Sequence, residues 1–150
     1  MNEPISFMSS YPHTLDDKGR LALPGKLRDE LKKSVRPDEM VAFAGEEGCV
    51  TLYTQEHWRE VEDSIVAIED TDDRNEALDY YMGNAERLSL DKAGRLLLPA
   101  HHRKTAGLER EVMVVGQSYK IVIRPRTADD ELETAKSRKP KPETIKKIRL

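Results

Sequence analysis

Apolar and polar residues alternate over several short stretches of the chain, the pattern of half-buried β-strands. These stretches are rich in β-branched residues and form two pairs, each joined around a glycine. The first pair covers residues 40–44 and 49–53, and the second covers residues 111–115 and 119–124.

The chain also contains an internal repeat. Residues 15–24 match residues 90–99 at seven of ten positions with a shift of 75, and the same shift relates Arg28 to Arg103. Each copy consists of an Asp-x-x-Gly turn, a short strand that begins at an arginine, and a proline that suits the start of a helix. A repeat of this kind predicts two copies of one structural unit. We expect the helices over residues 24–33 and 99–106, the second closed by Gly107.

A helical hairpin is expected between the two copies. Thr54 can cap its first helix, and apolar residues at three- and four-residue spacing give this helix one apolar stripe. A second helix is predicted over residues 72–82. The stripe either packs on the strands or, in part, on a neighbouring subunit. It consists of Trp58, Val61, Ile65 and Ile68.

These elements predict an α+β fold that is mainly β. One unit is too small to close a core, but two units can bury their apolar faces against each other, so we expect a pseudo-two-fold β-barrel with the helical hairpin as its connection. The predicted divisions are residues 7–54 for the first half, 55–84 for the hairpin, 85–126 for the second half, and 127–150 for a C-terminal helix and basic tail.

Charge is unevenly distributed, so the formal net charge of −3 does not argue against binding to nucleic acid. Residues 16–36 carry seven positive and four negative side chains, and residues 91–104 carry four and one. The tail, residues 136–150, carries seven and one, whereas residues 54–79 carry ten carboxylates and two arginines. The basic segments therefore coincide with both repeat copies.

The repeated turn carries the candidate chemistry. Glycine before the arginine can adopt a positive φ angle, which holds the arginine at a tight turn. The arginine offers a rigid fork of donors that matches O6 and N7 of guanine, and the aspartate four residues earlier can hold that fork in place. The alternative is an ion pair that only stabilises the turn. Duplication favours the first hypothesis, because two copies would place Arg20 and Arg95 on one surface.

Several other classes of protein are disfavoured. No stretch approaches the roughly 20 apolar residues that span a bilayer, and the first residues lack the pattern of a signal peptide, so we expect a cytoplasmic protein. The lone Cys49 is expected to be a buried strand residue. An enzyme or metal site would depend on His101 and His102 with Asp91, but adjacent histidines on a helix point about 100° apart. We therefore predict no catalysis, no metal and no cofactor.

The C-terminal part has two open interpretations. Thr127 can cap a short helix that continues to about Lys136, and the prolines that follow end it. The basic tail beyond is either a solvated solubility segment or an arm that contacts phosphates.

The doubled Leu-Asp-x-x-Gly-Arg-Leu-x-Leu-Pro motif, together with residues 108–117, resembles the MraZ family over about residues 7–124. This resemblance implies AbrB-like swapped-hairpin half-barrels that assemble into rings, are nucleoid-associated, and regulate the division and cell wall gene cluster by binding double-stranded DNA at short G-rich direct repeats. It implies that the repeated turns contact DNA. The implied site residues are Asp16, Lys18, Arg20, Asp91, Lys92 and Arg95.

The chain departs from the family pattern at two places. Ala93 stands in the second turn where the first has Lys18, so we rank the first turn above the second in binding DNA. Ser9 stands where the family usually has glycine. Pro12 interrupts an N-terminal strand that precedes the first turn, and it confines that strand to an edge or a bulge. The alternative function is an antitoxin-like or scaffold protein on the same fold, with incidental DNA contact.

Overall fold

The computed structural model describes residues 3–45, 48–127 and 139–149. Its strands are β1 (Ser10–Thr14), β2 (Arg20–Ala22), β3 (Glu39–Ala44), β4 (Val50–Tyr53), β5 (Ala85–Ser89), β6 (Arg95–Leu97), β7 (Glu111–Gln117) and β8 (Lys120–Pro125). Its helices are α1 (Gly25–Leu31), α2 (Gln55–Val66), α3 (Thr71–Ala77), the π-helix η1 (Leu78–Met82), α4 (Ala100–Thr105) and α6 (Pro142–Ile145). The fold is α+β, but helix and strand take similar shares of it, so the prediction of a mainly β chain is wrong.

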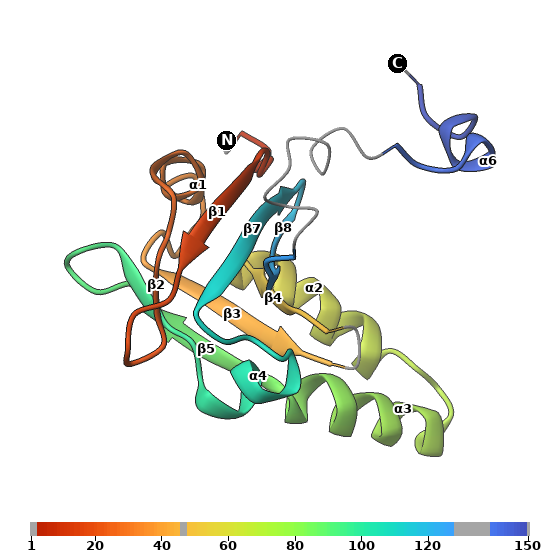
Figure 1. Cartoon of the computed structure of the whole chain (residues 1–150). Coiled ribbons are helices and arrows are strands. Elements are labelled where there is room, and N and C mark those ends of the chain that lie inside the picture. Colours follow the sequence, from red (N-terminus) through yellow and green to blue (C-terminus); the bar gives the residue numbers. More distant parts are fainter. Residues whose placement is uncertain (1–2, 46–47, 128–138, 150) are drawn as a thin grey trace.

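Six strands form one antiparallel sheet in the order β1-β7-β8-β4-β3-β5 (Figure 1). Replacing each strand by its repeat counterpart gives the same order read from the opposite edge, which is the internal two-fold relation that the repeat predicts. β1 of the first half pairs with β7 of the second, and β5 of the second pairs with β3 of the first. Each half therefore lends its first strand to the other, and β4 and β8 join the halves at the centre.

The sheet does not close into a barrel among the described residues, so the expectation of a closed pseudo-two-fold barrel is not met. β1 and β5 are the two edges. Between them lies a separate ribbon, the antiparallel pair β2 and β6, whose Leu21 and Leu96 are fully buried in the common core. Direct pairing of β1 with β5 would have closed the barrel. The ribbon covers the core in place of that pairing.

Local sequence signals explain the short helices. The helices begin one residue later than predicted, so Pro24 and Pro99 each precede their helix and do not form its first position. Gly107 follows α4 with φ of 66° and donates its backbone N–H to the Lys104 carbonyl, while Leu108 donates to the Arg103 carbonyl. This pair of bonds is the Schellman motif, and it confirms Gly107 as the end of the helix.

The helical hairpin packs on the sheet. The Thr54 hydroxyl caps α2 by accepting the His57 N–H at 3.2 Å, and the Trp58 ring lies 5.9 Å from the Phe43 ring of β3. Packing on the strands is therefore confirmed for the buried part of the stripe. The second helix begins at Thr71 and not at residue 72, and it passes into the π-helix η1. None of the described helices combines the length and the apolarity needed to cross a lipid bilayer.

Three smaller predictions have clear outcomes. Pro12 lies in β1, an edge strand, as predicted. Ser9 adopts φ of 77°, a conformation that favours glycine. Cys49 is half-buried and precedes β4, so the expectation of a buried strand residue is wrong. The expected helix from Thr127 to about Lys136 lies almost entirely outside the described residues.

Candidate nucleic-acid interface

The first repeated turn is held together by one carboxylate. The Asp16 Oδ1 accepts the backbone N–H of Lys18 at 3.0 Å and of Arg20 at 2.8 Å. Its Oδ2 accepts the Arg20 Nε–H at 2.5 Å. Gly19 has φ of 85°, the left-handed conformation that the turn requires. The arginine is therefore oriented through its Nε, which directs the two terminal nitrogens of its guanidinium away from the turn.

The second turn repeats this arrangement. The Asp91 Oδ1 accepts the backbone N–H of Ala93 and of Arg95, both at 2.9 Å, and its Oδ2 accepts the Arg95 Nε–H at 2.8 Å. Gly94 has φ of 77°. The two arginine side chains are 30% and 36% exposed. The ion pair of the structural hypothesis thus forms in both turns, and it leaves each arginine partly accessible.

The ribbon β2–β6 places both arginines on one face. Arg20 lies opposite Leu97 and Ala22 lies opposite Arg95. Because successive residues of a strand point to opposite faces, and Leu21 and its partner Leu96 are buried, both arginines point to the outer face of the ribbon. They are diagonal neighbours, which places their Cα atoms roughly 7 to 8 Å apart.

Each turn also receives an arginine from the other half. The Arg103 guanidinium of α4 lies against Gly19, and the Arg28 guanidinium of α1 lies against Gly94, so closely that a Cβ on either glycine would overlap it. Arg103 also donates from Nε to the Leu98 carbonyl at 3.1 Å. The shift of 75 relates these two arginines, and this relation is the only signal that sequence analysis offers for them. A role cannot be assigned from it, because the sequence does not show that each arginine crosses to the opposite turn.

The two turns are further linked through their backbones. Leu23 donates its N–H to the Gly94 carbonyl at 3.0 Å, and Leu98 donates to the Gly19 carbonyl at 3.1 Å. These reciprocal bonds join the ends of the ribbon to the two turns. The two candidate contact points form one structural unit.

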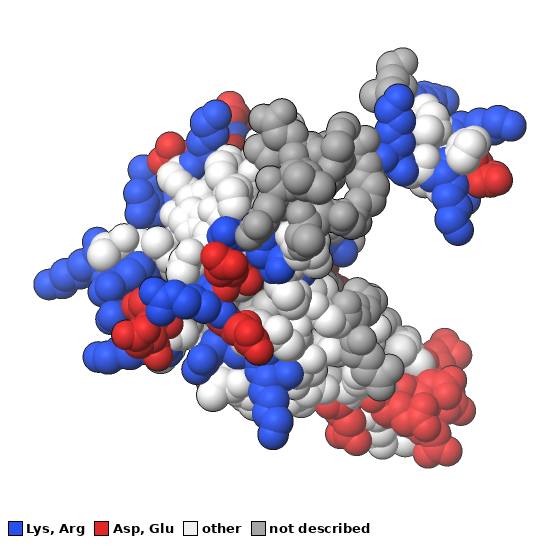
Figure 2. Space-filling view, viewed as in Figure 1, with Lys and Arg blue, Asp and Glu red and all other residues white. Residues whose placement is uncertain are grey.

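Charge separates the two ends of the molecule. Lysine and arginine side chains gather, with some acidic ones among them, over the end that carries the two turns, whereas the end that carries α3 is acidic (Figure 2). Lys18 and Lys92 are exposed beside the turns. A hollow of about 640 Å³ next to the second turn is lined in part by Arg28, Lys32 and Lys92. The turn end therefore offers basic side chains that a polyanion can contact.

The turn carboxylates are ionised at neutral pH. The backbone N–H of Arg20, more than any other group, lowers the pKa of Asp16 to about 2, and its side chain and the Lys18 N–H act in the same direction. The backbone N–H of Arg95 is the main cause that lowers the pKa of Asp91. Each arginine is therefore held by a full negative charge.

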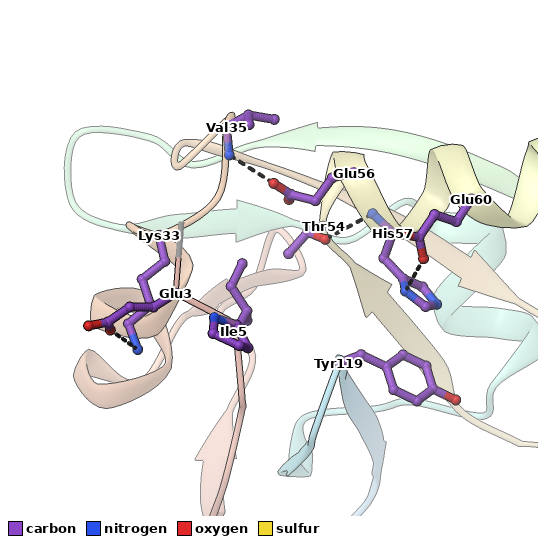
Figure 3. A pocket seen from close by; sticks show the side chains of 10 residues that line it. Glu3, Ile5, Lys33, Val35, Thr54, Glu56, His57, Glu60 and Tyr119 are labelled. Atoms are coloured by element: carbon purple, nitrogen blue, oxygen red, sulfur yellow. Dashed lines mark hydrogen bonds and ion pairs between the residues drawn. The ribbon is translucent and has the colours of Figure 1, made fainter. Parts of the chain in front are cut away.

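A second hollow of about 360 Å³ lies away from the turns, at the start of α2 (Figure 3). Its polar groups pair with one another or with their neighbours. Glu56 accepts the Val35 N–H at 2.9 Å and the Ser34 hydroxyl at 2.5 Å, and Lys33 pairs with Glu3 at 3.3 Å. These interactions join the first helix to the hairpin, and they give the hollow a structural role.

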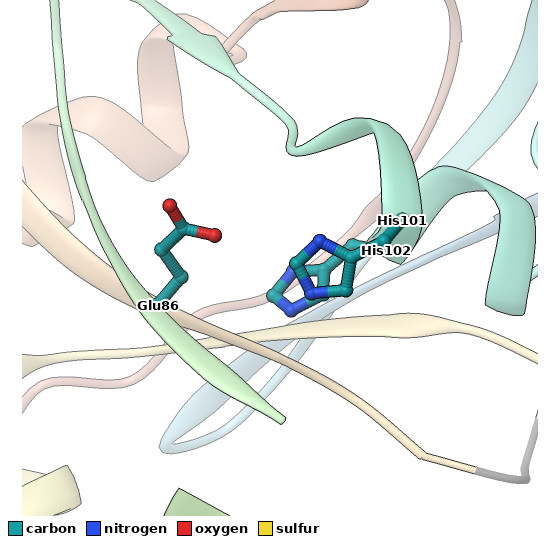
Figure 4. A group of neighbouring side chains, drawn as sticks. All are labelled: Glu86, His101 and His102. Carbon is teal, nitrogen blue, oxygen red and sulfur yellow. The ribbon is translucent and has the colours of Figure 1, made fainter. Parts of the chain in front are cut away.

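The adjacent histidines do not behave as the sequence predicts. Their rings lie 4.3 Å apart, and ligand atoms of both histidines and of Glu86 all lie within 4.8 Å of one another (Figure 4). The expectation that the His101 and His102 rings point apart is therefore wrong, because side-chain rotation brings the rings together. The acidic member of the group is Glu86 rather than Asp91.

The chain is similar to a known protein family over most of its length. A family model described as "MraZ protein, putative antitoxin-like" matches twice, over residues 6–80 and 81–144. The two matches correspond to the two repeat copies, so the tandem organisation found in the sequence is confirmed.

Relatives of similar length carry one name. The transcriptional regulator MraZ of Heliobacterium modesticaldum is 35% identical over 118 residues, which cover 78% of this chain and 79% of the relative. That of Moorella thermoacetica is 35% identical over 126 residues, 83% and 85% of the two chains, and that of Syntrophomonas wolfei is 32% identical over 118 residues, 78% and 79%. These names describe regulators and not enzymes, as the sequence predicts.

Proposed function

The chain belongs to the MraZ family, and from that premise we propose that it is a sequence-specific, double-stranded-DNA-binding transcriptional regulator. In this proposal Arg20 and Arg95 read guanine bases, Asp16 and Asp91 orient them, and Lys18 and Lys92 contact phosphates. The targets are short G-rich direct repeats that control the division and cell wall gene cluster, and the protein acts in the cytoplasm at the nucleoid.

The observation that carries the proposal is the ribbon β2–β6, whose outer face bears both arginines. A two-stranded ribbon fits into the major groove of B-DNA. The diagonal separation of roughly 7 to 8 Å corresponds to about two base-pair steps at the rise of about 3.4 Å per step. One ribbon can thus contact two guanines of one short repeat.

The carboxylates support this reading role because they restrict the arginines before DNA arrives. Each uses its Oδ2 to hold the Nε, which leaves the terminal nitrogens to donate to O6 and N7 of guanine. Fixing the side chain in advance reduces the conformational entropy that binding would otherwise remove. The ion pair and the reading function are therefore compatible.

Energetics favour an assembly of protomers over a single one. Two bidentate contacts supply about 2 to 6 kcal/mol of base discrimination, whereas specific sites typically exceed non-specific ones by about 4 to 10 kcal/mol. Several protomers on one DNA would increase avidity by about 10²- to 10⁴-fold. A head-to-tail ring suits direct repeats, because neighbouring subunits share one orientation.

The test is a binding titration of the wild-type protein and of the Arg20→Ala/Arg95→Ala variant. One DNA carries tandem G-rich repeats and a second carries the same bases scrambled, each at several salt concentrations. We expect the wild type to prefer the repeats, with a steep salt dependence. The variant should lose that preference while light scattering shows the same oligomer mass as for the wild type.

Equal, weak binding to both DNAs that is unchanged in the variant would contradict the proposal. Such a result would favour the second hypothesis, in which the fold serves an antitoxin-like or scaffold role. Loss of folding in the variant would favour the alternative in which the ion pairs stabilise the turns, so circular dichroism accompanies each titration.

A further inference from the structure

Glu86, His101 and His102 form a cluster outside the DNA-binding end. Glu86 lies on β5, and the two histidines lie on α4. One ligand atom from each residue lies within 4.8 Å of the others, and the carboxylate and the imidazole rings point toward the same space (Figure 4). Glu86 and His101 are exposed and His102 is buried, so the cluster opens to solvent on one side.

His102 makes the cluster unusual. The residue is 0% exposed, and among the residues that the structure describes neither ring nitrogen makes a hydrogen bond of good geometry. The backbone of Asn84 is the one hydrogen-bonding group of the described residues that acts on the ring. Buried polar atoms almost always have a partner, and leaving one without a partner costs about as much as desolvating it. An ion held between His102 and its two neighbours would supply the missing partner for one nitrogen.

The first half shows that the fold does not require a histidine here. The shift of 75 relates His102 to Leu27, which is 1% exposed in the same core, and relates His101 to Lys26 and Glu86 to Tyr11. The packing position is therefore filled by leucine in one copy and, in the other, by a histidine whose ring nitrogens make no hydrogen bond of good geometry with the described residues. The three ligand residues occur together in the second copy alone.

We propose that Glu86, His101 and His102 bind a divalent transition-metal ion, with Zn²⁺ as the best match. Two imidazoles and one carboxylate are a common three-residue donor set for Zn²⁺, with a fourth position for water. Metal–ligand bonds of about 2.0 to 2.1 Å in a tetrahedron place the ligand atoms about 3.3 Å from one another. The ligand atoms, which lie within 4.8 Å of one another, must therefore approach by up to about 1.5 Å. Rotation of the exposed Glu86 and His101 side chains can provide this movement.

The ion would tie the start of β5 to α4. β5 is the strand that the second half lends to β3 of the first, so the metal would secure one of the two swapped strands. The cluster includes neither turn arginine, but it shares α4 with Arg103, whose guanidinium lies against Gly19 of the first turn.

The experiment uses the full chain without a polyhistidine tag, stripped with EDTA and then dialysed. Isothermal titration with Zn²⁺ measures affinity and stoichiometry, and Co²⁺ gives visible absorption bands that report tetrahedral nitrogen and oxygen ligands. We expect one ion per chain. Loss of a residue that only supports a metal ligand typically weakens metal binding by about 10- to 100-fold. His101→Ala and Glu86→Gln remove ligands themselves, so each should weaken Zn²⁺ binding by at least that factor.

Two further variants separate the cluster from other metal ligands. His102→Leu, which reproduces the first half, should abolish the Co²⁺ bands while circular dichroism stays unchanged. His57→Ala is the matched control, because His57 pairs with Glu60 on α2 and should leave the affinity as in the wild type. Absence of stoichiometric Zn²⁺ binding, or binding unaffected by His101→Ala, would overturn the proposal.

Discussion

The two halves of the chain differ little at their turns and strongly at the helix that follows. Both turns use an aspartate to hold the Nε of an arginine, with Nε–Oδ2 distances of 2.5 and 2.8 Å. Three residues after the helix-starting proline, the first half has a buried leucine, Leu27, and the second half has the buried His102. The turn therefore has the same geometry in both halves, whereas the core position in the helix that follows is occupied by different residues.

This difference shows which positions of the repeated unit require a particular residue type. The turn depends on a carboxylate, a glycine with positive φ and an arginine, so all three recur. The helix only needs a side chain of suitable volume toward the core, so its polarity can change if a partner compensates. Exchanges between the halves test this division.

The largest effect is expected from exchanging the two core positions. Leu27→His would bury an imidazole without a partner, and we expect the free energy of unfolding to fall by about 2 to 4 kcal/mol. In EDTA, the reverse exchange His102→Leu should raise it by about 1 kcal/mol. Urea denaturation measures both. A loss below about 0.5 kcal/mol for Leu27→His would show that the two positions are equivalent.

A slightly smaller effect is expected at the turn glycines. In Gly19→Ala, the positive φ costs about 1 to 2 kcal/mol and the Arg103 guanidinium must move, so we expect a total near 2 kcal/mol. Gly107→Ala isolates the cost of φ, because Gly107 has φ of 66° and open space around its Cβ position. Equal losses in the two variants would show that the crossing arginine does not constrain the turn.

Single arginine variants test whether the turns contribute equally to DNA binding. We expect Arg20→Ala and Arg95→Ala each to reduce the preference for G-rich repeats by about 5- to 150-fold, with the larger loss for Arg20. Lys18→Ala should weaken binding to all sequences alike and lower the salt slope by about 1. Fluorescence anisotropy measures these changes. A larger loss for Arg95 would reverse our ranking of the turns.

The smallest effect concerns pH. Hydrogen bonding in the folded protein lowers the pKa of Asp16 to about 2 from its ordinary value of 3.8, so the stability that it contributes is complete above 3.8 and is lost as pH falls toward 2. NMR titration of the carboxyl carbons should place the Asp16 midpoint near 2, with the Asp91 midpoint also lowered. An ordinary midpoint for Asp16 would contradict the hydrogen-bonded turn.

Much of the fold could be predicted from sequence, because its main signals are local. The repeat, the turns, the Thr54 cap and the Gly107 helix end each depend on a few neighbouring residues. Barrel closure could not be predicted, because it depends on whether β1 and β5 meet, and the alternation pattern of a strand does not specify its partner. The π-helix at Leu78–Met82 likewise has no simple sequence signal.

The geometry of the two candidate turns could be predicted from the sequence, whereas their surroundings could not. The repeat identified both aspartates and both arginines, since spacing alone defines an Asp-x-x-Gly-Arg turn. Arg28 and Arg103 remained unassigned because their contacts cross between halves. The histidine cluster was dismissed because helical spacing describes where side chains leave the backbone and not where their rings end.

The most direct test of guanine reading is a double-mutant cycle between protein and DNA. Wild type and Arg20→Ala/Arg95→Ala are titrated against the repeat DNA and against the same DNA with 7-deazaguanine, which removes the N7 acceptor. We predict that the substituted DNA binds the wild type more weakly, by about 1 to 3 kcal/mol per contacted guanine, and that the variant binds both DNAs equally. Equal weakening of wild type and variant would contradict the claim that these arginines contact guanine.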